Sequence, residues 1–364
     1  MRSLGHPKSE KHNEDKPPTV AAQFLSYYPA FINEIPSKQL KEYYTKNGHL
    51  KLIKSLKVQV ISDIDTCHAL WQEFSPYNTL FDTWEFRLAF YNGYKYKPHF
   101  IVLKTEQENY ALLPLWYEDD EKRYVWFGSV WQEETSFLVK DPVFVPLLLS
   151  VCPSPLYLNA MTQDSLKWAS EYIGFTEDDP KYILDLTTIQ TVDDFLAMFK
   201  KKRRYNWRRD WKIIDNLKPE IHINKVFNLD QLIELSKRRF KEKGEETDWE
   251  DMRRIDAFRQ VVSLGQKNIS YSTRTITVTI NNQVAAVDLV AIYKNCYYPL
   301  KCGYDVARFP GIGNYVNLFE IKDALSLGMK KMDFLEIDYG WKSKWFESVS
   351  LYKYEKDYKV TTVG

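Results

Sequence analysis

The sequence predicts an α/β (α+β) protein with two halves, in which mixed, mostly antiparallel sheets are flanked by helices. The chain has 364 residues, which is long for a single hydrophobic core. Apolar strands alternate with amphipathic helices from residue 56 to about 186, as in layered α/β folds. After Gly265 the hydrophobic period changes from helical to alternating, which indicates a run of strands.

The first half is predicted at residues 21–186. The charged, proline-bearing residues 1–20 predict a disordered tail in front of it. The strands and helices of this first half are predicted from short apolar runs and from a helix stop signal at Gly174. The strands are 58–61, 100–104, 110–116, 124–127 and 156–160, and the helices are 66–74, 84–91 and 162–174.

The second half is predicted at residues 187–364, and it begins with a basic helix at 192–217. A capping-box pattern at Thr191 and Asp194 marks the start of that helix. A turn at Asn281-Asn282 joins two of the later strands. The remaining expected elements are helices at 229–243, 249–264 and 315–327, and strands at 275–280, 284–293, 296–302 and 332–337.

Composition excludes several classes of function. Lys plus Arg number 50 and Asp plus Glu number 49, so the net charge of +1 draws the protein to no polyanion, and any charge-driven binding must be local. The four cysteines have no C-x-x-C spacing, so we expect no metal. The apolar run at 143–152 is too short to span a membrane, and the N-terminal residues lack the apolar core of a secretory signal. We therefore expect a cytoplasmic protein with no transmembrane segment.

A glycine-bearing turn precedes the helix at 315–327. It reads Arg308-Phe-Pro-Gly311-Ile-Gly313-Asn314. Free amides at a helix start, together with the helix dipole, favour a bound anion, and glycine lets the backbone approach a phosphate. The turn is therefore a candidate pyrophosphate site. An ordinary turn at a helix start is the alternative.

Asp288 is a candidate general base. It is the lone carboxylate in a strand that is otherwise apolar on both faces, so burial should raise its pKa. A structural carboxylate bonded to backbone or to a lysine is the alternative.

The basic helix forms a local cationic surface. Lys200, Arg204, Arg208 and Lys212 recur every four residues and should line one face. Such a stripe suits phosphates, an acidic glycan or a lipid headgroup, and neighbouring aromatic residues could also stack on nucleic-acid bases. A solvated helix face is the alternative.

The C-terminal motifs resemble those of the GNAT acyl-coenzyme A N-acyltransferases, in the branch related to the cellulose-biosynthesis CelD proteins. In that branch a Pro-Gly helix start and a helix-ending Gly precede Asp-Phe-Gly-x-Gly-Asp-x-x-Tyr-Lys-x-x-Trp. The matching positions here are Pro310-Gly311, Gly328, Asp333-Phe334, Asp338, Lys342 and Trp345. Trp341 replaces the tyrosine, and Leu335 and Ile337 replace the two glycines. The resemblance implies two GNAT folds in tandem, as in the related Fem-type aminoacyltransferases.

The resemblance also implies roles for these residues. Acetyl-coenzyme A, or another acyl-coenzyme A, would be held by Arg308, Gly311, Gly313 and Asn314. Asp338 and Lys342 would act beside Asp288 in catalysis, and their spacing would let them pair on a helix. The acceptor would be held by Arg204, Arg208, Trp341 and Trp345.

Three functions remain open from the sequence. The first is N-acyl transfer, typically acetyl transfer, to an amino sugar, a glycan amine or another small amine. The second is aminoacyl transfer from charged tRNA, with the basic helix as the RNA contact. The third is a GNAT-like module that binds a partner without turnover, which the lost glycines would explain.

Overall fold

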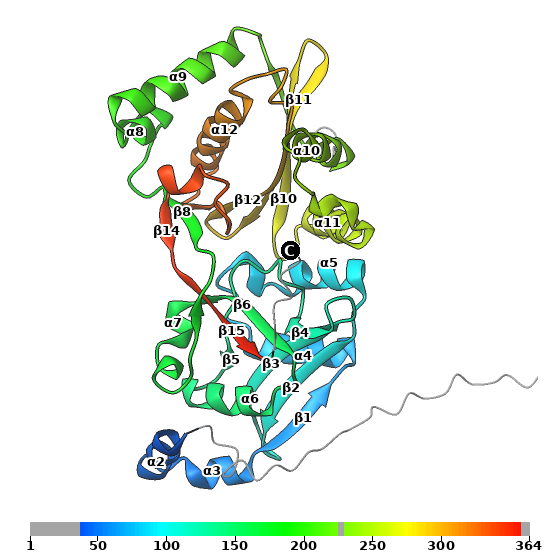
Figure 1. Ribbon diagram of the computed structural model, residues 1–364, viewed down its shortest axis with the longest axis vertical. Helices are drawn as coiled ribbons and strands as arrows, with labels where there is room; N and C mark the ends of the chain where they lie inside the picture. The colour runs from blue at the N-terminus through cyan, green and yellow to red at the C-terminus, as the bar shows by residue number, and fades with distance from the viewer. Residues whose placement is uncertain (1–36, 225–228, 358–364) are drawn as a thin grey trace, which may run out of the picture.

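Two sheets and their flanking helices make up the computed structural model, which describes residues 37–224 and 229–357 (Figure 1). The tail predicted at 1–20 lies outside the described residues. Both sheets are mixed and mostly antiparallel, which confirms the predicted fold class.

The first sheet has the strand order β1-β2-β3-β4-β6-β15-β7, with β5 paired to β3. Its strands are β1 Lys57–Ile61, β2 Pro98–Lys104, β3 Asn109–Glu118, β4 Arg123–Trp126, β5 Leu138–Val139, β6 Leu156–Thr162, β7 Thr176–Glu177 and β15 Leu351–Lys356. The second sheet has the order β14-β8-β13-β12-β11-β10-β9. Its strands are β8 Lys181–Asp185, β9 Glu220–Ile223, β10 Ser272–Ile280, β11 Gln283–Tyr293, β12 Cys296–Tyr304, β13 Lys331–Asp333 and β14 Glu347–Val349.

The helices cover the outer faces of both sheets and fill the space between them (Figure 1). Those of the first half are α2 Lys38–Lys46, α3 Leu50–Ser55, α4 Ile64–Phe74, α5 Trp84–Tyr94, α6 Val145–Val151 and α7 Gln163–Leu166. Those of the second half are α8 Val192–Ala197, α9 Lys201–Asp215, α10 Leu229–Lys243, α11 Met252–Gln266 and α12 Ile312–Ser326. Short 3-10 turns lie at Leu80–Asp82, Pro142–Phe144, Ala169–Glu171, Asp248–Glu250 and Lys342–Lys344.

The predicted basic helix at 192–217 is wrong as one element. The capping box is present, because the Thr191 hydroxyl accepts from the Asp194 amide and the Asp194 carboxylate accepts from the Thr191 amide. However, the helix that it starts ends at Ala197. Lys200 adopts an extended conformation with a ψ of 150°, and a second helix begins after it.

Two strands cross the boundary that we placed at residue 186. Strand β8, which precedes that boundary, pairs with β13 and β14 of the second sheet. Strand β15, near the end of the described chain, pairs with β6 and β7 of the first sheet (Figure 1). The domain boundary stays a prediction, but each sheet is completed by a strand from the other side of it. The two halves are therefore tied together by backbone hydrogen bonds.

The largest hydrophobic cluster lies between the two sheets. Helices α4 and α5 of the first half and α10 and α11 of the second half contribute its side chains. Helices α5 and α11 approach so closely at Gly93 that a Cβ there would lie 2.6 Å from the Arg253 carbonyl oxygen and 2.7 Å from the Ala257 Cβ. Only glycine fits this contact without moving one of the helices.

Hydrogen bonds and an ion pair also join the two halves at this junction. The Arg253 guanidinium lies 2.6 Å from an Asp120 carboxylate oxygen and donates to the Tyr96 hydroxyl at 3.0 Å. The Tyr293 hydroxyl donates to the Tyr77 carbonyl oxygen at 2.7 Å. The relative position of the two halves is thus fixed by both packing and hydrogen bonds.

We expect Gly93→Ala to lower the free energy of unfolding by about 1 to 3 kcal/mol, because a methyl group would force α5 and α11 apart. Urea unfolding of the variant and the parent measures this loss. Gly174→Ala is the matched control, since a Cβ at Gly174 meets nothing within 4 Å. An equal effect of the two substitutions would contradict the close contact.

Candidate functional site

The glycine turn lies at the start of α12, and the carboxylate of Asp210 packs against it. Gly311 has a φ of 93° and caps the helix. Asp210 of α9 packs so closely that a Cβ on Gly311 would lie 3.0 Å from the Asp210 Cβ. The side-chain amide of Asn314 donates to Asp210 at 2.6 Å, and the Arg209 guanidinium donates to the other carboxylate oxygen at 2.7 and 2.9 Å.

This arrangement does not fit a pyrophosphate at the turn. A buried carboxylate already provides the negative charge that a helix N-terminus favours, and it would repel a second anion. Arg308 is directed elsewhere: it donates to the Gln283 side chain at 3.2 Å and lies 3.7 Å from Asp305. The assignment of Arg308, Gly311, Gly313 and Asn314 to coenzyme A therefore stays a prediction that needs α9 to move.

Asp288 lies in a buried carboxyl pair beneath α12. Burial raises the pKa of Asp288 to about 7, as the covered strand predicted, although hydrogen bonds from Tyr304 and Glu320 oppose the rise. The Tyr304 hydroxyl donates to Asp288 at 2.7 Å. Burial and the Asp288 charge raise the pKa of Glu320 well above its usual value. Such a pair holds a proton near neutral pH, but both residues are almost fully buried. A catalytic role for Asp288 stays a prediction.

Asp338 and Lys342 do not form the ion pair that their spacing suggested, because residues 338–341 are not helical. The Asp338 carboxylate accepts from the amides of Trp341 and Lys342 at 2.8 and 2.7 Å and from Ser343. Although burial opposes it, these hydrogen bonds lower the pKa of Asp338 to about 2. The Lys342 ammonium donates instead to the carbonyl oxygens of Phe334 and Glu336, at 2.5 and 2.6 Å. Both side chains thus hold the loop after β13 in shape.

That loop keeps the backbone conformation of the glycine motif. Leu335 and Ile337, which stand where the resembling family has glycine, have φ values of 66° and 58°. This left-handed region is costly for leucine and more so for β-branched isoleucine. The shape of the loop is therefore retained even though its glycines are replaced.

The four predicted acceptor-binding residues lie around α9. The Trp345 ring packs on Trp207 of α9 with centroids 4.0 Å apart, and the Trp341 ring lies 5.4 Å from Trp345. Arg208 forms an exposed ion pair with Asp193 at 2.8 Å, and Arg204 is half-buried. These positions link α9 to the loop after β13. A role in acceptor binding stays a prediction for all four.

A different set of ionisable groups meets at the junction of the two halves. We define the junction cluster as Glu133, Lys301, Glu336 and Lys342, with the ring of Trp131. Trp131 and Glu133 lie between β4 and β5 of the first half, and Lys301 lies on β12 of the second half. The Lys301 ammonium lies 3.9 Å from the centre of the Trp131 ring. The Glu133 carboxylate accepts from the Glu336 amide at 2.8 Å.

The pKa values in the junction cluster are strongly displaced. Burial lowers the pKa of Lys301 to about 8, although the nearby Glu133 charge opposes the fall. Burial raises the pKa of Glu133, against the charges of Lys301 and Lys342. Burial and the Glu133 charge raise the pKa of Glu336 to about 10. A lysine that loses its proton near neutral pH beside protonatable carboxyls is typical of acid–base sites.

The cluster retains access to solvent. Glu133, Lys301 and Glu336 are only partly buried, unlike the Asp288–Glu320 pair. The neighbouring ion pairs are structural: Lys181 bonds Asp333 at 3.0 Å and also Glu134, and these carboxylates raise the pKa of Lys181 against the effect of burial. No local sequence pattern singles out Glu133 and Lys301, because each is an ordinary charged residue in its own segment.

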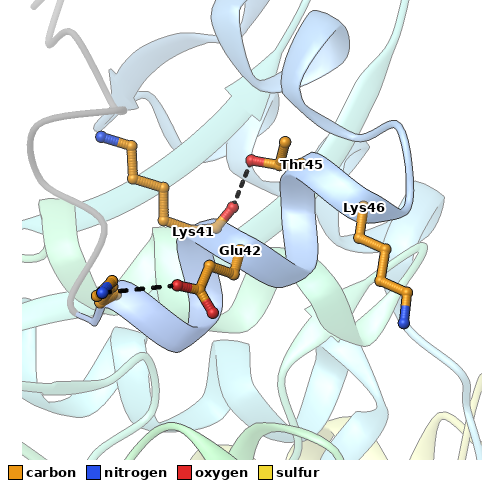
Figure 2. A pocket seen from close by; sticks show the side chains of 5 residues that line it. Lys41, Glu42, Thr45 and Lys46 are labelled. Carbon is orange, nitrogen blue, oxygen red and sulfur yellow. Dashed lines mark hydrogen bonds and ion pairs between the residues drawn. The ribbon is translucent and has the colours of Figure 1, made fainter.

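Two surface hollows away from the junction are lined by none of the predicted site residues. Figure 2 shows one on α2, where Lys41, Glu42, Thr45 and Lys46 extend from a single helix. The ion pair there, Lys38 with Glu42 at 3.9 Å, has exposed side chains. Another hollow lies beside β2 and β3 and is lined by charged and amide side chains. Within residues 37–224 and 229–357, no His, Cys, Asp and Glu side chains are grouped so as to hold a metal ion.

Several solved structures are similar in fold over most of this chain. FemX has a TM-score of 0.53 at 12% identity, over 82% of this chain and 97% of FemX. L-PGS from Bacillus licheniformis has a TM-score of 0.52 at 11% identity, over 82% of this chain and 94% of that one. A tandem GNAT protein from the clavulanic acid biosynthesis pathway has a TM-score of 0.50 at 9% identity, over 82% and 98%. At such identities the likeness establishes the fold alone, and that fold is a tandem GNAT fold.

The family of the second half follows from its sequence. Residues 189–343 match the family model described as "Acetyltransferase (GNAT) domain". These residues therefore belong to the GNAT superfamily, in its CelD-like family, and they form a GNAT acyltransferase domain. No curated protein sequence matches the chain.

We expect Ile337→Gly to raise the free energy of unfolding by about 0.5 to 1 kcal/mol, because glycine relieves the left-handed strain at an exposed position. Urea unfolding measures the gain. Ile269→Gly is the control: Ile269 is also exposed but lies outside the left-handed region, so glycine there should destabilise. A loss of stability in both variants would show that the backbone at Ile337 is not strained.

Proposed function

We propose that the protein is a GNAT-type N-acyltransferase whose acceptor amine is deprotonated at the junction cluster. The observation that carries the proposal is the contact of Lys301 with the Trp131 ring across the two halves, at 3.9 Å, with the pKa of Lys301 lowered to about 8 by burial. The GNAT assignment of residues 189–343 supplies the reaction class.

The chemistry requires a base near neutral pH. An acceptor amine is protonated in water and cannot attack an acyl carbon until it loses a proton. Neutral Lys301 would accept that proton, and the amine nitrogen would then bond to the acyl carbon while the bond from that carbon to the donor's leaving atom breaks. Glu133 would favour the ammonium form of Lys301 that results, because the carboxylate and the ammonium attract one another. The attacking nitrogen loses a second proton as the amide forms, this proton passes to the leaving group, and Lys301 returns its own proton to solvent.

The geometry of the glycine turn does not decide which acyl donor the protein uses. Acyl-coenzyme A is the donor that GNAT proteins typically use, and acetyl-coenzyme A is our first candidate. The Asp210 carboxylate at the start of α12 favours the alternative, an aminoacyl ester of tRNA, which need not place a pyrophosphate at this turn. An amino sugar or another small amine remains the proposed acceptor.

Substitution of the junction cluster tests the proposal. We expect Lys301→Met to reduce kcat/KM about 10²- to 10⁴-fold, the usual contribution of a general base. Transfer would be measured with acetyl-coenzyme A and with aminoacyl-tRNA over a panel of amino sugars and small amines. Lys267→Met removes an exposed lysine of the same half and should leave the rate unchanged. Equal rates in both variants, with unchanged circular dichroism, would rule out Lys301 as the base.

A separate titration tests the turn. We expect Asp210→Asn to tighten acetyl-coenzyme A binding about two- to thirtyfold, because it removes the charge that competes at the helix start. Isothermal calorimetry measures the change. Asp215→Asn, at the exposed end of the same helix, is the control, and Arg308→Ala in the Asp210→Asn background should reverse the gain. If the parent already binds acetyl-coenzyme A tightly and Asp210→Asn has the same affinity, the Asp210 carboxylate does not compete with the pyrophosphate at the turn.

A further inference from the structure

We propose that the outer face of α9 binds the surface of an anionic lipid membrane. The inference goes beyond the proposed acyl transfer and rests on how α9 is packed, what its outer face carries, and where it lies. Figure 1 places α8 and α9 at the end of the molecule away from the first sheet.

The packing of α9 fixes which side faces outward. Trp207, Asp210 and Ile214 are buried, and their spacing places them on one side of the helix. That side lies against α12, where the Trp211 and Tyr315 rings stack with centroids 4.4 Å apart. The opposite side is therefore presented to solvent.

That outer side is cationic. Residues 200–212 contain eight Lys and Arg and one acidic residue, Asp210, which is on the buried side. Lys201, Arg208 and Lys212 are exposed along one line of the helix, and Arg209 and Lys202 flank it. Lys201 and Lys212 lie about 16 Å apart along the axis, so the line is long enough to meet several phosphates. Arg208 is paired with Asp193, but both side chains are exposed, and such pairs are weak.

The same region exposes large apolar side chains. Tyr205 is 65% exposed in the middle of the cationic line, and Ile213 is 45% exposed at its edge. Met198 and Leu217, just before and after the helix, are also exposed. These four are among ten exposed large hydrophobic residues in the described chain, so a short segment holds a large share of them.

The combination favours a lipid surface over RNA. Anionic headgroups attract Lys and Arg, and the acyl boundary below them takes up aromatic and aliphatic side chains. An RNA backbone would use the cations, and a base could stack on Tyr205, but Met198, Ile213 and Leu217 would stay in water. Binding would be peripheral, since no helix of the described residues is long and apolar enough to cross a membrane.

Vesicle co-sedimentation tests the proposal. The full chain should bind phosphatidylcholine vesicles that contain phosphatidylglycerol, and bind vesicles of phosphatidylcholine alone at least about tenfold more weakly. Lys201→Glu/Lys212→Glu should reduce binding to the anionic vesicles at least about tenfold. The control Lys51→Glu/Lys54→Glu, which makes the same change in charge on exposed residues of α3, should bind like the parent.

A second pair of variants separates lipid from other polyanions. Tyr205→Ser/Ile213→Ser should weaken vesicle binding and should make the remainder more sensitive to salt, whereas Ile269→Ser/Val306→Ser, exposed elsewhere, should not. Thermal unfolding of every variant checks the fold. The proposal is overturned if the anionic vesicles are not bound, if the α9 charge variant binds them like its control, or if a structured RNA is bound instead and the apolar variant retains full affinity for it.

Discussion

The contact of α5 with α11 at Gly93 determines the geometry of the whole molecule. Because no Cβ intervenes, the two helices form a shared core between the two sheets. The exchanged strands β8 and β15 tie the halves together on the other side. Trp131 and Lys301 come from different halves, so their contact exists only while this junction is intact. The site is thus a property of the tandem arrangement and not of the GNAT domain alone.

The Asp288–Glu320 pair and Lys301 lie on opposite faces of β12 and have different environments. On its α12 face, Tyr304 bonds Asp288 beside Glu320 in a carboxyl pair that is almost fully buried. On its α11 face, Lys301 lies among the rings of Trp131, Trp249 and Phe258. Burial displaces the pKa on both faces, toward the neutral form in each case. Only the α11 face combines the displaced pKa with access to solvent, which is why we place proton transfer there.

The sequence predicted the features that depend on local patterns. Alternation identified β10, and a continuous apolar run identified β11. A capping box located the start of α8, a glycine motif marked the turn before α12, and the motif after β13 pointed to the GNAT fold. The covered strand also predicted the raised pKa of Asp288. Three features join residues that are distant in sequence. They are the exchange of β8 and β15, the Asp210 carboxylate at the turn, and the contact of Lys301 with the Trp131 ring. No local pattern records such contacts, since only the tertiary packing brings them about.

The most direct test of the account is the titration of Lys301 itself. Competitive acylation of the lysines as a function of pH, read by mass spectrometry of the peptide that contains Lys301, measures its pKa without any substrate. We expect a midpoint near pH 8 in the parent and a lower one in Glu133→Gln, because the Glu133 charge stabilises the ammonium. A midpoint near the ordinary lysine value of 10.5, unchanged by Glu133→Gln, would contradict the site at the junction.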